Sequence, residues 1–224
     1  MKIALISDVH ANEPALRAVV EQIQSRDPDL VVCVGDIVGY GPNPAACLEL
    51  VRDFADIVVA GNHDRTTQTP EQYAHHPTAG PGLQHAAEEL DSTQLQWLRE
   101  LPDRSTIGQE SILIVHSHPD PARQGAYVHP DKFENVGKNV DTDFLILGHT
   151  HVQHAEQVDG TLVVNPGSVG QPRDGNPKAA YAVVDTTDQS ANLQRVAYDI
   201  GCVRDDVEAA GLPEKAWQRL QDGN

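Results

Sequence analysis

The stretch KIALISDVHAN, residues 2–12, sets the pattern for the first half of the chain. Its apolar run at 3–6 is typical of a buried strand, and the run stops at a turn that carries Asp8 and His10. The asparagine that ends the stretch is a suitable helix cap, and apolar residues recur at helical spacing over 13–25. A strand, a polar turn and a helix in this order predict an α/β fold.

The same pattern returns before residue 65. An apolar run at 30–34 ends at Gly35-Asp36, and a run at 57–59 ends at the segment GNHD, with a helix expected between them at 44–51. Residues 65–91 are polar and weakly periodic, so we expect a loop with short helices there. Further along the chain, the pattern predicts a helix from Ser92, strands at 112–115, 143–147, 152–158, 161–165, 179–185 and 191–197, and a helical tail at about 203–221.

The second half differs from the first in its strand connections. Asp159-Gly160 separates two of the expected strands and is a strong hairpin signal. A parallel half is therefore expected to precede a half rich in antiparallel strands. Because no repeat and no linker divides the chain, we expect residues 1–224 to form a single α/β domain with two packed mixed sheets and helices outside.

The composition limits the partners of the protein. Hydrophobic residues make up 39% of the chain and aromatic residues only 4%, which predicts a folded core of Val, Leu, Ile and Ala. The formal net charge is −17, and such a field repels phosphate backbones, so we expect no nucleic acid polymer as a partner. The 33 acidic residues against 5 lysines suggest a halophilic source, the alternative being an ordinary acidic protein.

The cysteines and the lengths of the apolar runs indicate the cellular compartment of the protein. Cys33, Cys47 and Cys202 include no close pair, which argues against a disulfide framework and a cysteine zinc site. A strand is expected directly from Lys2, which leaves no room for a signal peptide, and no run approaches the roughly 18 apolar residues of a membrane span. We therefore expect a cytoplasmic protein without a membrane partner, and leave a homo-oligomer open.

Five of the expected strands end in side chains that can bind metal ions. A lone aspartate at a strand end is usually a turn or helix cap, and a lone histidine is usually solvated, but five such ends in one chain make coincidence improbable. Ligands bind at the carboxyl ends of parallel strands, so these five ends can converge on one crevice. Carboxylate oxygen and imidazole nitrogen suit zinc, manganese, iron or nickel. The segments are Asp8-Val9-His10, Gly35-Asp36, Gly61-Asn62-His63-Asp64, His116, and Gly148-His149-Thr150-His151.

In their order and their residues, these segments resemble the motifs of the calcineurin-like metallophosphoesterases. The resemblance extends from Lys2 to about Asp185. That family carries the motifs D-x-H, GD, GNHD, H and GHTH, and all five occur here in this order. The segments SDVHAN, GDIVGYGP and NPGSVGQPRD are similar to its small uncapped branch, typified by YfcE-like phosphodiesterases. The resemblance implies a four-layer α/β/β/α sandwich around a centre of two divalent cations.

The resemblance also implies a role for each motif residue. The two cations would be manganese, nickel, iron or zinc, with manganese favoured. His63 would approach the substrate and protonate the leaving oxygen or stabilise the transition-state charge, and Asp64 would orient His63. The implied metal ligands are Asp8, His10 and His151 for the first ion, and Asn62, His116 and His149 for the second, with Asp36 bridging both.

The implied reaction is hydrolysis of small phosphodiesters by attack of a metal-bridged hydroxide. One alternative is a catalytically weak, metal-bearing interaction module, like the retromer subunit of this fold, but that protein lacks the catalytic histidine that this chain keeps at position 63. The other alternative is a nuclease, which the short acidic chain disfavours. Two positions stay open: His118, which is solvated or reaches the leaving group, and Arg173, which lies on the surface or contacts phosphate.

Overall fold

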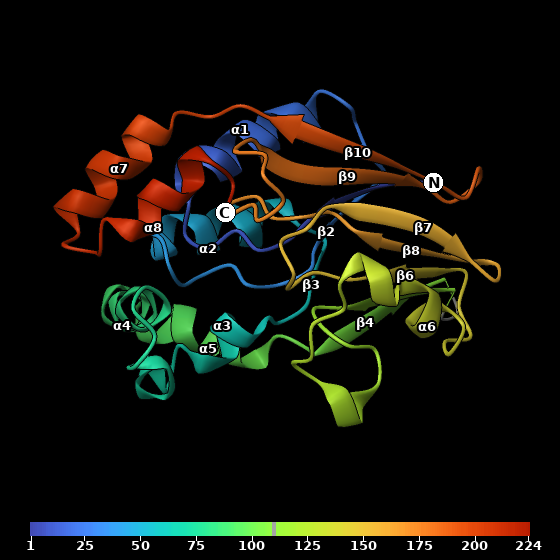
Figure 1. Cartoon of the computed structure of the whole chain (residues 1–224), viewed down its shortest axis with the longest axis horizontal. Helices are drawn as coiled ribbons and strands as arrows, with labels where there is room; N and C mark the ends of the chain where they lie inside the picture. Colours follow the sequence, from blue (N-terminus) through green and yellow to red (C-terminus); the bar gives the residue numbers. More distant parts are fainter. Residues whose placement is uncertain (109–110) are drawn as a thin grey trace.

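The computed structural model describes residues 1–108 and 111–224, and their strands form two five-stranded mixed sheets (Figure 1). The strands of the first sheet are β1 (Lys2–Ile6), β2 (Leu30–Cys33), β3 (Ile57–Val58), β9 (Ala179–Asp185) and β10 (Ser190–Val196). Their order is β10-β9-β1-β2-β3. Because β1, β2 and β3 run parallel, their carboxyl ends meet at one edge of the sheet.

The second sheet consists of β4 (Arg104–Ile107), β5 (Ile112–Val115), β6 (Phe144–Ile146), β7 (His154–Val158) and β8 (Thr161–Asn165), in the order β4-β5-β6-β8-β7. Strands β7 and β8 form the predicted hairpin, with positive φ at Asp159 and Gly160. The second half is rich in antiparallel pairs, as predicted, and also contains the parallel strands β5, β6 and β8. Strand β4 was not predicted, because this half-exposed edge strand carries few apolar residues.

Most of the predicted helices are present. Asn12 caps the first of them, since its Oδ1 accepts a hydrogen bond from Ala15 N at 3.2 Å. Asn43 precedes the second, but its side chain donates instead to Asp206 Oδ2 at 2.8 Å. The helices are α1 (Glu13–Gln24), α2 (Pro44–Phe54), α3 (Asn62–Thr66), α4 (Ala79–Glu89), α5 (Ser92–Glu100), α6 (Phe133–Gly137), α7 (Ile200–Ala209) and α8 (Lys215–Gln218), with short 3₁₀ turns η1 (Pro70–Tyr73), η2 (Pro121–Arg123), η3 (Pro130–Lys132) and η4 (Arg219–Gln221).

Helix α4 is longer than the short helices expected in the 65–91 region, because its glycines hid it from the sequence pattern. Gly82 is required there for packing: a Cβ at this position would collide with the backbone of Tyr40. The glycine lets α4 approach the loop that follows β2, and this loop carries Asp36, one of the predicted metal ligands.

Three clusters of buried apolar residues form the layers that confirm the predicted two-sheet architecture, and a fourth lies among α7, α8 and η4. One cluster lies between the first sheet and helices α1 and α2, a second between the two sheets, and a third between the second sheet and α6 (Figure 1). Aliphatic residues dominate all three clusters, as the composition predicts. Cys33 and Cys47 are buried, Cys202 is exposed, and all three are free. No helix in the described ranges has the length and hydropathy needed to span a membrane.

Candidate metal centre

The predicted metal-binding side chains lie together where the carboxyl ends of parallel strands from both sheets face each other. Asp8 and His10 follow β1, and Asp36 follows β2. The two sheets are packed face to face, so the loops after β5 and β6 reach the same place from the other side. All of the predicted ligands are buried except the half-buried Asn62. The remaining members are His116 after β5, and His149 and His151 after β6.

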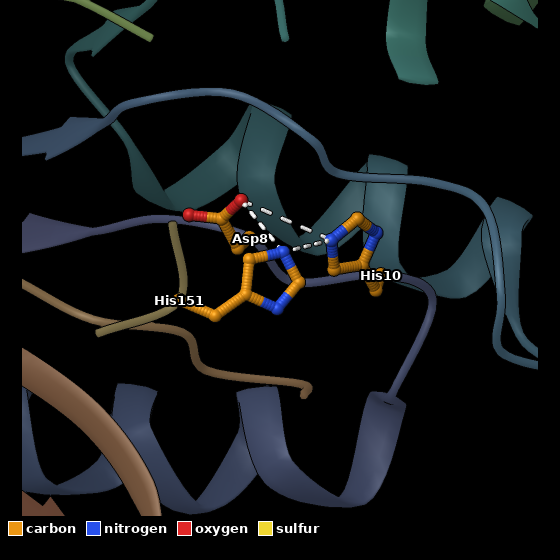
Figure 2. A group of neighbouring side chains, drawn as sticks. All are labelled: Asp8, His10 and His151. Atoms are coloured by element: carbon orange, nitrogen blue, oxygen red, sulfur yellow. Dashed lines mark hydrogen bonds and ion pairs between the residues drawn. The ribbon is translucent and has the colours of Figure 1, made fainter. Parts of the chain in front are cut away.

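Asp8, His10 and His151 form the first cluster (Figure 2). The Nε2 atom of His151 lies 3.2 Å from Asp8 Oδ1, and the Nε2 atom of His10 lies 3.8 Å from the same oxygen. The two Nε2 atoms are 3.0 Å apart. Asp8 Oδ2 accepts hydrogen bonds from Ser7 Oγ and His149 N, whereas the buried Oδ1 has no hydrogen-bond partner among the residues that the structure describes. One carboxylate oxygen and two ring nitrogens therefore face a common point.

The backbone determines which ring nitrogens carry lone pairs. His10 Nδ1 lies 3.1 Å from Val38 O, and His151 Nδ1 lies 2.6 Å from Gln171 O. A carbonyl oxygen can only accept, so each Nδ1 carries a proton and each Nε2 is the ring nitrogen that faces Asp8. The two Nε2 atoms, 3.0 Å apart, can approach so closely only with a proton or a metal cation between them. This arrangement, a ligand histidine anchored through its other nitrogen, is typical of metal sites.

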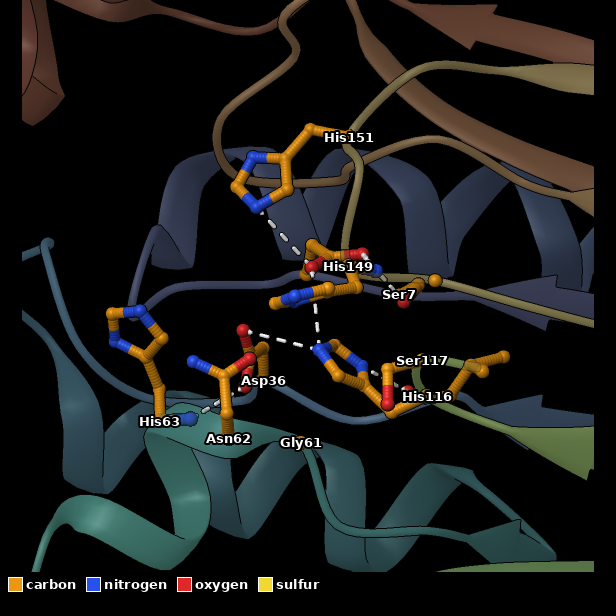
Figure 3. Close-up of polar contacts among 12 residues, drawn as sticks. Ser7, Asp36, Gly61, Asn62, His63, His116, Ser117, His149 and His151 are labelled. Atoms are coloured by element: carbon orange, nitrogen blue, oxygen red, sulfur yellow. Dashed lines mark hydrogen bonds and ion pairs between the residues drawn. The ribbon is translucent and has the colours of Figure 1, made fainter. Parts of the chain in front are cut away.

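Asp36, His116 and His149 form the second cluster (Figure 3). His116 Nε2 lies 3.3 Å from Asp36 Oδ2, and its Nδ1 donates to Val34 O at 2.7 Å. His149 is anchored the other way round, since its Nε2 donates to Gly125 O at 3.1 Å and leaves Nδ1 as the acceptor. The buried Oδ1 of Asn62 has no hydrogen-bond partner among the described residues, so the amide can offer one more oxygen.

Asp36 lies between the two clusters. Its Oδ2 is 3.7 Å from His10 Nε2, a member of the first cluster, and 3.3 Å from His116 Nε2, a member of the second. Its Oδ1 accepts a hydrogen bond from the backbone N of His63 at 2.8 Å, which fixes the orientation of the carboxylate. A Cβ on Gly61 would collide with this carboxylate, which explains why the GNHD turn begins with glycine.

The charges of the site favour a cation. Burial lowers the pKa of His149 to about 4 and lowers that of His10 well below its usual range, so both rings are neutral at pH 7. Burial by itself also lowers the pKa of His116, but Asp36 and Asp8 outweigh it and raise this pKa to about 10. Without a metal, a proton on His116 thus balances part of the carboxylate charge that a metal ion would balance.

Backbone strain is concentrated in the same residues. A left-handed conformation costs a residue other than glycine roughly 1–2 kcal/mol, and such strain clusters at functional sites. Neither the strain nor its location is visible in the sequence. Five of the predicted ligands have positive φ: Asp8 (53°), His10 (49°), Asp36 (53°), His149 (69°) and His151 (59°).

His63 lies beside His10 and Asp36, and one possible ligand atom of each of these three residues lies within 4.8 Å of the other two (Figure 3). Its ring centroid is 4.9 Å from that of His10 and 4.7 Å from that of Tyr40, and its ring also packs against Tyr73 at 5.6 Å. Its Nδ1 is buried and has no hydrogen-bond partner in the described part of the chain. The ring is held by packing, and its Nδ1 is left free for another group.

The predicted role of Asp64 was wrong. Its carboxylate does not hold the ring of His63 but accepts hydrogen bonds from backbone amides of two loops. Oδ2 accepts from the N–H groups of Asp36 at 2.8 Å and Gly61 at 2.9 Å, and Oδ1 accepts from those of Ile37 at 2.9 Å and Val38 at 3.3 Å. Asp64 therefore ties the loop that carries Asp36 to the loop that carries Asn62 and His63.

Several supporting residues were not predicted. Ser168 Oγ donates to Asp8 O at 2.6 Å, and Asn165 Nδ2 donates to Gly148 O at 2.7 Å, so the 165–173 segment holds two ligand loops in place. The segment was noticed in the sequence, but its contacts depend on the pairing of β8 with β6. Tyr127 stacks on His149 with ring centroids 4.0 Å apart, and nothing in the sequence indicates this contact.

The two positions left open by the sequence lie on different sides of the centre. A cleft of about 550 Å³ opens beside the second cluster, and Asn62, His116 and His118 contribute to its lining. His118 is half-buried and accepts a hydrogen bond from Asp120 N, so it stays outside both ligand clusters. Arg173 lies beside the first cluster, where its backbone N donates to His151 O at 3.2 Å.

Comparisons with known proteins identify the family of the chain. The model of the calcineurin-like phosphoesterase superfamily domain matches residues 1–189. A metallophosphoesterase structure from Sphaerobacter thermophilus is 34% identical, with 100% of both chains covered and a TM-score of 0.86. An uncharacterised protein of Methanocaldococcus jannaschii is 33% identical, covering 97% of this chain and 96% of that protein. Phosphodiesterase YfcE of Escherichia coli K12 is 26% identical, covering 83% of this chain and 88% of that protein. The chain therefore belongs to the calcineurin-like phosphoesterase superfamily, a family of divalent-metal-dependent hydrolases that act on phosphate esters.

Proposed function

We propose that the protein hydrolyses small phosphodiesters at a centre of two divalent cations. The observation that carries this proposal is the pair of ligand clusters on either side of Asp36, whose Oδ2 lies within 3.7 Å of a ring nitrogen from each. A single ion would leave one group of buried acceptor atoms without a positive partner, which is costly. Two ions would satisfy both groups.

Each predicted site residue except Asp64 has a role in this proposal. Bound cations would activate a water molecule and offset the charge on the phosphate oxygens. His63 would donate a hydrogen bond to the leaving oxygen, because its ring lies beside His10 and Asp36 and its Nδ1 has no partner among the described residues. The first ion would be held by Asp8, His10 and His151, the second by Asn62, His116 and His149, and Asp36 would bridge them.

The surroundings of the centre favour a small substrate. The cleft beside Asn62 and His116 has room for the group attached to one phosphate oxygen. The loops 65–91, 117–130 and 166–178 carry only four cationic side chains, which disfavours a long nucleic acid. Relatives include an enzyme named phosphodiesterase, YfcE, which supports diester chemistry.

Oxygen and imidazole donors without a thiolate suit manganese, nickel, iron or zinc, and we propose manganese first. We further propose a cytoplasmic protein from a salt-rich cell, in view of the net charge of −17. Residues 1–224 are proposed to be one domain, because helix α7 packs against α1 of the first layer.

The test combines metal content with activity. Protein loaded with manganese should contain two metal ions per chain by elemental analysis and should hydrolyse bis(p-nitrophenyl) phosphate. Replacing Asp36 with asparagine should reduce both the metal content and the activity, whereas Asp53→Asn, at an exposed position of α2, should change neither. One tightly bound ion per chain in an active enzyme would refute the dinuclear centre, and absence of diester hydrolysis with two bound ions would refute the proposed reaction.

A further inference from the structure

Asn62 is anchored differently from the other ligands of the two clusters. Each histidine of the clusters donates a ring N–H to a backbone carbonyl oxygen, and the fold as a whole sets the position of that oxygen. Asn62 is only half-buried, and its Nδ2 donates to the hydroxyl oxygen of Tyr73 at 3.3 Å. Within the described ranges, no other side chain or backbone group bonds to this amide. A single side chain therefore holds Asn62, and a substitution can remove it.

The contact with Tyr73 leaves the amide oxygen of Asn62 for a cation. An amide donates from its nitrogen and accepts at its oxygen, so Oδ1 is the atom that can bind a metal ion. Nδ2 points to Tyr73, and the buried Oδ1 has no partner in the part of the chain that the structure describes. A buried acceptor without a partner is costly. A cation at Oδ1 and the hydroxyl oxygen at Nδ2 thus favour the same orientation of the amide.

Tyr73 is itself fixed by its surroundings. It is the last residue of η1, and its backbone O accepts a hydrogen bond from His76 N at 2.8 Å. Helix α4 packs so closely on this backbone that a Cβ at Gly80 would collide with Tyr73 O. The centroid of the Tyr73 ring lies 5.6 Å from that of His63. Because both its backbone and its ring are held, the Tyr73 hydroxyl offers a fixed acceptor to Asn62.

We propose that Tyr73 is a positioning residue of the metal centre, which holds the Asn62 amide so that Oδ1 faces the second ion. This inference rests on the proposed function, in which Asn62 is a ligand of that ion. It gives a role to a residue outside the five sequence motifs. Hydrogen bonds that orient a metal ligand typically contribute about 10- to 100-fold to metal affinity. The contact with Tyr73 joins two neutral groups, so we expect the lower end of this range, about tenfold.

The test measures manganese binding to the metal-free protein by calorimetry, so it does not depend on catalysis. Tyr73→Phe removes the hydroxyl and keeps the ring against His63. It should lower the affinity for one of the two ions about tenfold and leave the other within about twofold. Tyr181→Phe is the matched control, because that hydroxyl also accepts one hydrogen bond, from Arg26 Nε at 2.8 Å. Arg26 precedes the amino end of β2, whereas the metal centre lies at the carboxyl end, so Tyr181→Phe should keep both affinities.

A double-mutant cycle separates the positioning of Asn62 from a general structural role of Tyr73. Asn62→Ala should weaken binding of the same ion, which keeps its other three proposed ligands, Asp36, His116 and His149. Adding Tyr73→Phe to Asn62→Ala should change this affinity by less than about twofold, because the amide that the hydroxyl holds is already gone. Losses that add in the double variant would mean that Tyr73 does not act through Asn62.

Four results would overturn the role of Tyr73: unchanged affinities in Tyr73→Phe, an equal loss for both ions, the same loss in Tyr181→Phe, or additive losses in the cycle. Thermal melting of the metal-free variants checks that they fold. This role and the proposed function can fail separately. If the affinities behave as expected but no phosphate ester is hydrolysed, the proposed reaction is refuted and the role of Tyr73 stands. If the wild type and Tyr73→Phe bind two ions equally well, only the role of Tyr73 is refuted.

Discussion

Replacing Asp64 with asparagine should destabilise the protein without acting directly on the chemistry. The buried carboxylate accepts four backbone N–H bonds, two at each oxygen. An asparagine of the same shape keeps one acceptor oxygen and turns an NH₂ group toward the N–H groups of Asp36 and Gly61. Hydrogen bonds to a charged group contribute about 1.5–3 kcal/mol each. The variant loses the two hydrogen bonds at the oxygen that the NH₂ group replaces. Because it also removes a buried charge, we take the lower value for each bond, which gives a loss of about 3 kcal/mol in the free energy of unfolding.

For a chain of this size, that loss lowers the melting temperature by roughly 6–12 °C. Burial, followed by the charge of Asp36, raises the pKa of Asp64 to about 6, so ionisation of Asp64 opposes folding as the pH rises through about 6. The assay is therefore run at pH 8 with saturating manganese, so that the carboxylate is ionised and bound cations offset the charge of Asp36 that opposes this ionisation. Melting is followed by calorimetry with saturating manganese, and Asp53→Asn serves as the exposed control. A variant with unchanged melting temperature but strongly reduced kcat would refute this reasoning and restore the role of Asp64 in orienting His63.

The remaining predictions concern activity, salt and metal. His63→Ala should keep both metal ions but lose about 10²–10⁴-fold in kcat, and loss of the metals would instead make His63 a ligand. The melting temperature should rise as the KCl concentration goes from about 0.1 M to molar levels, because the Debye length falls from about 10 Å to about 3 Å. The salt then screens the repulsion between neighbouring carboxylates such as the exposed Glu88 and Glu89. A melting temperature that stays flat or falls, with metal saturating throughout, would remove the case for halophily. A small diester should have a higher kcat/KM than single-stranded or duplex DNA under the same conditions, and efficient cleavage of long DNA would favour a nuclease. Chelation should lower the melting temperature, since the lone pairs of His10 and His151 lose the cation between them; equal melting with and without metal would argue against that site.

The sequence predicted the parallel start of the fold well because each strand there is an uninterrupted apolar run that ends at a polar turn. Strands β1, β2 and β3 lie within two residues of their predicted ends. The prediction was weaker where local signals conflict with packing. Helix α4 contains Gly80, Pro81 and Gly82, which look like a loop, yet close contact with the Tyr40 backbone makes the last glycine favourable. Strand β4 depends on pairing with β5, which the order of residues does not reveal.

Some features of the candidate site could likewise be predicted from the sequence, and others could not. The types of its metal-binding side chains, and their positions after apolar strands, were readable from the sequence because parallel strands bring their carboxyl ends to one edge. Their mutual orientation was not readable, because it depends on anchors far away in the chain. His116 is held by Val34 O and His151 by Gln171 O, and these carbonyls decide which ring nitrogen faces the metal. Asp64 shows the limit most clearly. Its place in the GNHD motif suggested a partner for the adjacent histidine, but the packed loops surround it with four amide donors, and a buried carboxylate binds the donors that reach it.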